Sequence, residues 1–564
     1  MSGIIEMNRP KKGRDKGLFF LAVPIICTAA LLYPIALSGL SGDDIPNSMR
    51  SAVLHVNNWS RWDFIKLTIT QWRTNEGRFF PISSIENVFM FDFIHSVAIY
   101  KILQLLVTIL VLAIAAATLG KIVKDQRVFV LALFVLVSCI QTRNWYDPTL
   151  GFGLLLQSVQ IKILLCIFAL SCFLEETGRR RFCYLAFSVS LWIMALLQYE
   201  VVVTLLPALV GLVIIRSENR FGKVIAFLTI GLPTAVYLYF VNRLRSGVSA
   251  SSAYSIHIDL ASVSITYLKQ LSGALPFSAA IWSRGASSIL ASLSDLPLYL
   301  LFLISATVCL ALSLQSSLRD ISNKSLVILL IIGANFILGP AITTALSLRW
   351  QSEVDWGLSY LSVSFAYTGV AFVAVAVMSI LSKMCQGRTL LSVAITSSFL
   401  VFFTLSAVSN YALLTDNALA TQVSREQRNL YESAVKEGFM SDIPDNSVII
   451  YAAYNENSWV NSYFTSWLGG PAEISFVNSL EDAHQLCSTN AFLKKCPPKF
   501  LLEYNSIQNS RFVLSLIQLV DNHKVSNVKH RFFAQRVLPG DFESLCPDKK
   551  PLPDIDNIFS CPTS

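Results

Sequence analysis

The chain has 564 residues, of which 54% are hydrophobic and only 14% charged, and its mean hydropathy is +0.56. Soluble proteins carry about 25% charged residues. The composition therefore excludes a soluble globular enzyme, a disordered chain and a fibrous chain, and it indicates a polytopic membrane protein. For such a chain, the formal net charge of +8 raises the question of which side of the bilayer the basic residues face. No nucleic-acid partner is expected.

Eleven apolar segments have roughly the length that crosses a bilayer as a helix. The third, fifth and sixth are short or flanked by polar residues. The first, residues 18–40, is long for the apolar region of a signal peptide, so we favour an uncleaved first helix over a cleaved leader. The approximate centres of the eleven segments are Ala29, Leu110, Leu133, Leu165, Ser190, Pro207, Gly231, Ala306, Ile332, Val370 and Phe399.

Basic residues gather in alternate connections between these segments, as expected of cytoplasmic loops. The cytoplasmic segments carry 18 lysines and arginines against seven acidic residues. This pattern predicts a cytoplasmic N-terminus (residues 1–17), a transmembrane domain (18–409) with a long first outer loop (41–95), and an outer tail (410–564). The 18 basic residues are Arg9, Lys11, Lys12, Arg14, Lys16, Lys121, Lys124, Arg127, Arg179, Arg180, Arg181, Arg216, Arg220, Lys223, Arg319, Lys324, Lys383 and Arg388.

The tail is polar and holds no apolar run long enough to span a membrane. Residues 417–439 are typical of an amphipathic helix, residues 447–452 of a buried strand, and residues 512–520 of either a strand or a helix. The predicted fold is therefore an all-α polytopic membrane protein of about eleven transmembrane helices, N-terminus inside and C-terminus outside. A small mixed α/β domain follows at the C-terminus.

The 11 cysteines fall into two groups. Seven lie in or beside the apolar segments and are typical of small buried residues. The four in the tail, Cys487, Cys496, Cys546 and Cys561, suggest two disulfides in an oxidising compartment. We expect nearest-neighbour pairing over the other two arrangements, and over a zinc site, because the close Cys-x-x-Cys spacing of zinc ligands is absent.

Two adjacent carboxylates, Asp43 and Asp44, follow the first apolar segment. Because neighbouring acids repel, the pKa of one can rise enough for it to act as a general base. The alternative is a solvated loop that turns at Gly42 and Pro46. Further along the first outer loop, Gly77 precedes Arg78, whose guanidinium suits phosphate or carboxylate recognition. Arg78 is also placed to pair with one of the two acids and brace the loop.

Other polar groups lie at predicted outer helix ends. Tyr199 and Glu200 interrupt an apolar stretch, and an ionisable residue at a membrane boundary is a functional candidate, although Glu200 is equally placed to cap the turn in water. Arg143 lies in a second outer turn, and Arg349 and Glu353 in a third. Phosphate loops, dinucleotide-binding glycine motifs and His-Glu-x-x-His are absent.

The acids after the first helix resemble the motif of the GT-C superfamily of membrane glycosyltransferases. The segment Trp72…Gly77-Arg78-Phe79 and the pair Tyr199-Glu200 are similar to elements of bacterial members that modify O-antigen, including serotype-converting glucosyltransferases. The resemblance implies a bacterial inner-membrane enzyme whose active site faces the periplasm, with Asp43 or Asp44 as the catalytic base. Arg78, with Arg143 and Arg349, would neutralise a leaving phosphate.

The implied partners are a polyprenyl-phosphate-linked sugar, a lipid-linked or lipopolysaccharide glycan acceptor and membrane lipids. No cofactor is expected, and a divalent cation is not expected to be essential. Three alternatives remain open: an O-antigen-type polymerase, a lipid-linked glycan transporter or flippase, and an assembly protein whose tail binds a partner.

Overall fold

The computed structural model describes residues 14–143, 147–217, 220–246, 256–294, 296–385, 388–451, 460–471, 473–489, 498–507, 511–519 and 530–534. The chain divides into two compact units. The first comprises Met1–Ser38, Ile65–Asn87 and Ala98–Leu419, and the second comprises Gly39–Phe64, Val88–Val97 and Ala420–Ser564. Parts of the predicted first outer loop therefore fold with the tail.

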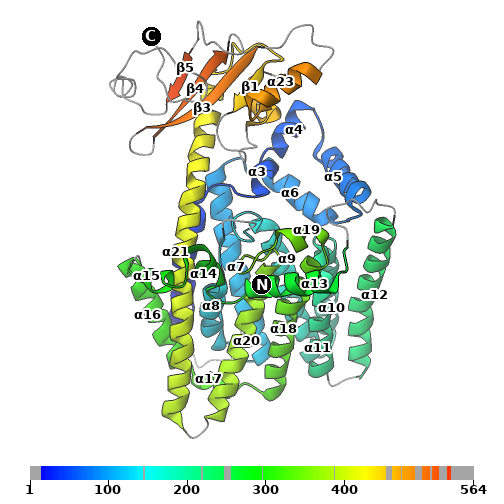
Figure 1. Ribbon diagram of the computed structural model, residues 1–564. Coiled ribbons are helices and arrows are strands. Elements are labelled where there is room, and N and C mark those ends of the chain that lie inside the picture. Colours follow the sequence, from blue (N-terminus) through cyan, green and yellow to red (C-terminus); the bar gives the residue numbers. More distant parts are fainter. Residues whose placement is uncertain are drawn as a thin grey trace. The chain divides into compact units, whose positions relative to one another are not determined.

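The first unit is a helical bundle (Figure 1). Helices satisfy every backbone hydrogen-bonding group internally, as a lipid environment requires. Six helices in the described part of the chain are long and apolar enough to cross a membrane, which indicates a multi-pass membrane protein. They are α7 (Val97–Val123), α9 (Gly153–Glu175), α12 (Arg220–Arg245), α18 (Asn323–Ala345), α20 (Val363–Met384) and α21 (Thr389–Lys436).

All eleven predicted centres lie in helices. Six of the centres fall in the long helices just named, and the other five fall in shorter helices. Three of these coincide with the third, fifth and sixth apolar segments, which the sequence already marked as short or polar-flanked. The first helix ends before Pro34, which starts a separate short helix, α2 (Pro34–Leu37). The number of spans thus stays a prediction. The five are α1 (Arg14–Leu32), α8 (Val128–Cys139), α10 (Arg180–Leu196), α11 (Leu206–Arg216) and α16 (Leu298–Ser313).

Helices α18 and α20 approach each other closely at a pair of glycines. A Cβ atom added to Gly369 would lie 2.5 Å from the carbonyl oxygen of Gly333, and one added to Gly333 would lie 2.8 Å from that of Gly369. Small residues permit such backbone contact between membrane helices. In contrast, α12 lies at the edge of the bundle in Figure 1 and is the least buried of the six long helices.

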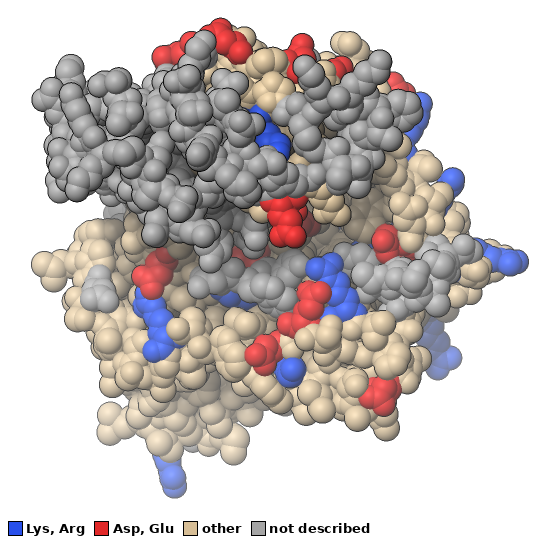
Figure 2. All heavy atoms as spheres, turned by 45° about the horizontal axis from the view of Figure 1, so that its top comes forward, with Lys and Arg blue, Asp and Glu red and all other residues tan. Residues whose placement is uncertain are grey.

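Short helices connect the long ones, and most of the described surface in Figure 2 carries no charge. The connecting helices of the first unit are η2 (Glu200–Leu205), α13 (Leu260–Ser272), α14 (Ser278–Arg284), α15 (Ser288–Ala291), α17 (Ser316–Arg319) and α19 (Leu348–Glu353). Helices α5 (Arg61–Glu76) and α6 (Pro81–Phe93), like α21, contribute residues to both units.

The second unit contains a five-stranded sheet in the order β2-β1-β3-β4-β5. Strand β1 is parallel to β2 and β3, whereas β3, β4 and β5 are antiparallel. The predicted strand at residues 447–452 is confirmed as β1, and residues 512–520 fall mostly in a strand, β4. The remaining elements are α3 (Asp44–Asn47), α4 (Arg50–Val56), β1 (Val448–Tyr451), α22 (Ser462–Trp467), β2 (Ser475–Val477), α23 (Leu480–Thr489), β3 (Lys499–Ile507), β4 (Arg511–Leu519) and β5 (His530–Ala534).

The seven cysteines in or beside the spans are unpaired. The predicted disulfides of the tail fall outside the described residues. Cys496, Cys546 and Cys561 are not among these residues, and Cys487 lies in α23 but its side chain is not described. The tail disulfides therefore remain a prediction.

Candidate functional site

A cavity of about 230 Å³ lies in the first unit and is lined by three of the residues that the sequence singled out, Arg78, Tyr199 and Glu200. Its walls come from the segment before α6, from η2, and from helices α12, α18 and α19. Further lining residues include a cation, Arg245, and several aromatic and hydroxyl side chains: Tyr237, Trp350, Tyr360, Thr204, Thr343, Thr344 and Ser347.

Two arginines share one carboxylate in this cavity. The Nε atom of Arg78 lies 3.0 Å from Oε1 of Glu200, and Nη2 of Arg245 lies 3.6 Å from the same oxygen. The side chain of Glu200 is 20% exposed and that of Arg78 is 12% exposed. Glu200 is therefore not a cap that projects into water, and the three groups together carry one excess positive charge.

Local backbone geometry presents Arg78 to the cavity. Gly77 has a φ of +61°, a conformation that suits glycine, and the Arg78 amide donates to the carbonyl oxygen of Trp72 over 3.1 Å. The guanidinium then lies over the rings of Trp72 and Phe80, with 5.4 Å and 4.9 Å to the ring centroids. This aromatic contact orients the side chain and favours its charge.

Glu200 begins η2, directly after the extended backbone of Tyr199. Asn335 of α18 holds the far end of this short helix. Its amide donates to the carbonyl oxygen of Thr204 over 3.0 Å, and its side-chain oxygen accepts from the amide of Ala208 over 3.1 Å. Asn335, a polar residue within the ninth apolar segment, thus has a structural role.

Trp350 and Tyr360 stack against each other on another part of the wall, with ring centroids 3.7 Å apart. Arg349 lies over the Trp350 ring at 4.6 Å, and its Nε atom is 2.8 Å from Oε1 of Glu353. Among the described residues, Arg349 and Glu353 do not line the cavity themselves. Arg349 contacts Trp350, which does, and Glu353 contacts Arg349.

Arg143 occupies a different place in the first unit. It is buried and donates to the hydroxyl of Tyr367 and, over 3.3 Å, to the carbonyl oxygen of Gly273. Its backbone amide donates to the carboxylate of Asp147 over 2.6 Å. Arg143 is absent from the described lining of the cavity that holds Arg78, so the structure does not group these two predicted phosphate-binding residues.

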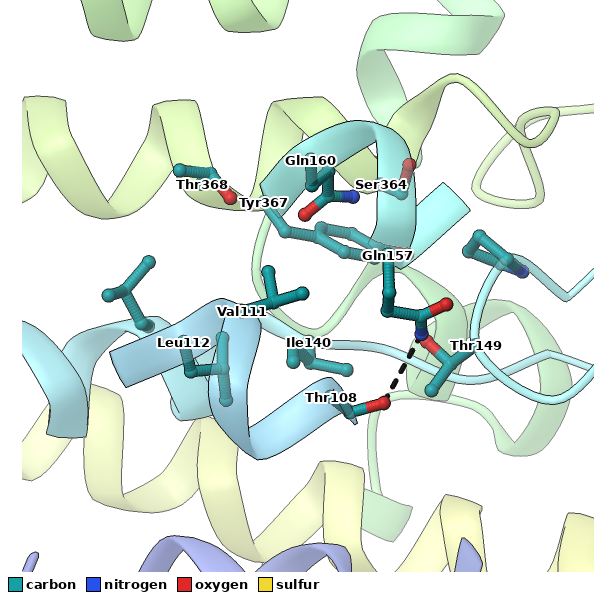
Figure 3. A pocket seen from close by; sticks show the side chains of 12 residues that line it. Thr108, Val111, Leu112, Ile140, Thr149, Gln157, Gln160, Ser364, Tyr367 and Thr368 are labelled. Atoms are coloured by element: carbon teal, nitrogen blue, oxygen red, sulfur yellow. Dashed lines mark hydrogen bonds between the residues drawn. The ribbon is translucent and has the colours of Figure 1, made fainter. Parts of the chain in front are cut away.

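A smaller cavity of about 30 Å³ lies beside Tyr367, between α7, α9 and α20 (Figure 3). Gln157 of α9 donates to the hydroxyl of Thr108 of α7 over 3.2 Å. A cavity of this size holds a water molecule and has no room for a sugar. We therefore take the cavity that holds Arg78 and Glu200 as the candidate site.

Asp43 and Asp44 belong to the second unit. Gly42, with a φ of +55°, turns the chain just before them, and Asp44 is only 3% exposed whereas Asp43 is exposed. Burial lowers the pKa of Arg50 on α4 to about 10, while the nearby carboxylate of Asp43 opposes this shift. The two acids therefore differ in environment, as two carboxylates with separate roles do.

Sequence reasoning missed a polar network next to the candidate site, formed by Glu86, Ser158, Lys162 and Gln198. The signal in the sequence that points to it is a polar face on α9, the fourth apolar segment, where Ser158 and Lys162 are four residues apart. No group of three or more histidine, cysteine, aspartate or glutamate side chains is arranged to hold a metal ion within the described ranges.

No protein-family model and no curated protein matches the sequence. Among solved structures, ArnT from Cupriavidus metallidurans bound to undecaprenyl phosphate is 12% identical. That match covers 89% of this chain and 98% of ArnT, with a TM-score of 0.41. The apo form of the same ArnT is 13% identical over 92% of this chain and 98% of ArnT, with a TM-score of 0.39.

The archaeal oligosaccharyltransferase AglB from Archaeoglobus fulgidus, in complex with an inhibitory peptide and a dolichol-phosphate, is 12% identical. This match covers 81% of the present chain and 65% of AglB, with a TM-score of 0.34. Because all three scores are below 0.5, the functional proposals rest on the residues of the chain itself.

Proposed function

We propose that the protein is a glycosyltransferase that moves a sugar from a polyprenyl-phosphate-linked donor to a cell-surface glycan such as O-antigen. The observation that carries this proposal is the cavity that combines the Arg78–Glu200–Arg245 cluster with the stacked rings of Trp350 and Tyr360. Guanidinium groups suit phosphate oxygens. Aromatic rings offer flat apolar faces against which the C–H faces of a sugar can pack.

The cavity also suits a donor with a long apolar tail. One of its walls comes from α12, which contributes Tyr237, Leu238 and Arg245. Leu228, Leu232 and Val236 on the same helix are each at least 60% exposed, as expected of a helix that faces lipid. A lipid-linked donor therefore needs no aqueous route to bring its phosphate to the arginines.

In the proposed reaction, the acceptor hydroxyl loses its proton to Asp43 or Asp44, and its oxygen bonds to the anomeric carbon of the donor sugar. The bond between that carbon and the phosphate oxygen breaks, and the lipid phosphate leaves with the electron pair. Arg78 and Arg245 stabilise the added negative charge, and no metal ion is required. The proposed location is a bacterial inner membrane, with the site facing the periplasm.

The test is transfer from a synthetic polyprenyl-phosphate sugar to an O-antigen acceptor by the purified chain in lipid nanodiscs. We expect at least one of Asp43→Asn and Asp44→Asn to abolish transfer while the variant still inserts and folds. Asp63→Asn, a change at an exposed acid of the same loop, is the control and keeps activity. Full activity in both Asp43→Asn and Asp44→Asn contradicts the mechanism.

The same preparation separates the alternatives. A polymerase would join whole lipid-linked repeat units and leave a single lipid-linked sugar untouched. A flippase would move labelled donor between leaflets of a liposome without forming a glycosidic bond, and it would tolerate both Asp→Asn changes.

A further inference from the structure

Four polar side chains, from helices α6 and α9 and from the turn between α10 and η2, form a closed network in the first unit. The Nζ atom of Lys162 on α9 donates to Oε1 of Glu86 on α6, to Oγ of Ser158 and to Oε1 of Gln198, each over 2.6 Å. The other carboxylate oxygen of Glu86 accepts from Nε2 of Gln198 over 2.6 Å and from Ser158 over 2.8 Å.

The charged and amide groups of this network all have hydrogen-bond partners within it. An ammonium has three protons to donate, and Lys162 donates one each to Glu86, Ser158 and Gln198. Gln198 is 1% exposed and uses both its amide oxygen and its amide nitrogen. The Lys162 side chain is 8% exposed, so loss of its carboxylate partner would leave a buried charge unpaired. These contacts define one orientation of the Gln198 side chain.

The network lies directly beside the candidate site in the chain. Gln198 immediately precedes Tyr199 and Glu200, which line the cavity. Glu86 lies on α6, the helix that follows Arg78, and the amide of Ile82 near the start of α6 donates to the carbonyl oxygen of Leu197 over 3.1 Å. The segment that carries Arg78 and the segment that carries Glu200 are thus joined at two points outside the cavity.

We propose that Glu86 and Lys162 are positioning residues that fix the turn at residues 197–200 and so set the distance between Arg78 and Glu200. Neither residue is among the described lining of the cavity, so they act through Gln198, which both contact. The effect on catalysis rests on the proposed transferase function. The effect on the turn does not.

The first measurement is hydrogen–deuterium exchange of the full chain in nanodiscs. We expect amides of residues 197–205 to exchange about tenfold faster in Glu86→Gln. The double variant Glu86→Gln/Lys162→Met removes both charges and leaves no unpaired ion, so it reports on the turn even if the single variant fails to fold. It should show the same faster exchange.

The matched control is Glu175→Gln, which removes a carboxylate that Lys121 and Arg216 bind at a distant point of α9. It breaks a comparable ion cluster but should leave exchange of residues 197–205 unchanged. Wild-type exchange of that segment in the double variant, or equal acceleration in the control, would overturn the positioning role.

The second measurement is donor kinetics. A misplaced Glu200 should lower kcat/KM for the lipid-phosphate sugar by roughly tenfold to a hundredfold, and Lys162→Arg, which keeps the charge, should recover part of this loss. If the wild-type chain shows no transfer while the exchange result holds, the proposed function fails and the positioning role stands. If transfer occurs and neither exchange nor kinetics responds, the positioning role fails alone.

Discussion

The contact between Arg78 and Glu200 should make a measurable contribution to the free energy of unfolding, and a double-mutant cycle isolates it. The perturbations are Arg78→Gln, Glu200→Gln and the double change. The two side chains are 12% and 20% exposed, and the pair lies between the buried and surface extremes. Exposed ion pairs contribute about 0.2–1 kcal/mol, whereas removal of one partner from a buried pair costs about 3–5 kcal/mol.

Two features of the structure adjust this value. Arg245 lies 3.6 Å from the same carboxylate oxygen, so Glu200 keeps a partner when Arg78 is removed. Arg78 also loses its contact with the rings of Trp72 and Phe80, which adds about 0.5–1 kcal/mol to the single change but cancels from the cycle. We therefore expect a coupling free energy of about 1–2 kcal/mol, between the value of an exposed ion pair and that of a buried one.

The assay is denaturant unfolding of the purified chain in detergent micelles, at low and at high salt. The control cycle is Arg349→Gln with Glu353→Gln, an exposed pair four residues apart on α19 that should couple by only about 0.3–0.5 kcal/mol. A coupling free energy for Arg78 and Glu200 no larger than that of the control pair would refute the account of the cavity as a partly buried charge cluster.

Three further predictions concern the scaffold. Gly369→Ala should destabilise the folded protein by about 1–3 kcal/mol through overpacking, because its Cβ would lie 2.5 Å from the Gly333 carbonyl oxygen. In the control Gly231→Ala, the added Cβ meets nothing within 4 Å and the change should be neutral. The yields of folded protein in size-exclusion chromatography compare the two variants. Ser322→Ala should cost about 1 kcal/mol in thermal unfolding, because its side chain accepts from the Ser325 amide at the start of α18; an unchanged Tm contradicts this. Burial of Asp125 opposes its ionisation, but the hydrogen bonds that it accepts from Arg127 outweigh this effect and lower its pKa. The Tm difference between wild type and Asp125→Asn should therefore be largest near neutral pH. It should vanish as the pH falls through that lowered pKa. A difference that persists unchanged at acid pH, where the carboxyl group is protonated, would count against the pairing.

The sequence predicted the helices well because apolar segments of spanning length leave few alternatives in lipid. It was less informative about their length: Pro34 ends the first helix early, and the segments around Leu133 and Pro207 form helices of only 12 and 11 residues. The sequence places Arg78 in the first outer loop and Tyr199 and Glu200 at an outer helix end, so all three fall on the same side of the membrane, but it offers Asp43 or Asp44 as the partner of Arg78 and does not indicate the contact with Glu200. That reasoning also placed Arg143 with them, although its own contacts are with Gly273, Tyr367 and Asp147.

The Glu86–Lys162 contact could not be predicted from spacing. The two residues are 76 positions apart, and Lys162 alone inside an apolar run looks like an isolated charge. Only the packing of α6, α9 and α10 brings their side chains together. The same holds for Arg245, which the sequence shows at the end of an apolar segment without any hint that it shares a carboxylate with Arg78.

The glycine contact between α18 and α20 has a consequence for how the cavity can change shape. Because each glycine faces the backbone carbonyl oxygen of the other helix with no side chain between them, the two helices are already in close backbone contact, and Thr343 and Thr344 near the end of α18 lie on a tightly packed wall of the cavity. The facing residues Tyr237, Leu238 and Arg245 come from α12, the least buried long helix. The cavity thus has one tightly packed side and one lightly packed side, and the proposed lipid-linked donor would enter from the side of α12, where the fewest packing contacts have to be broken.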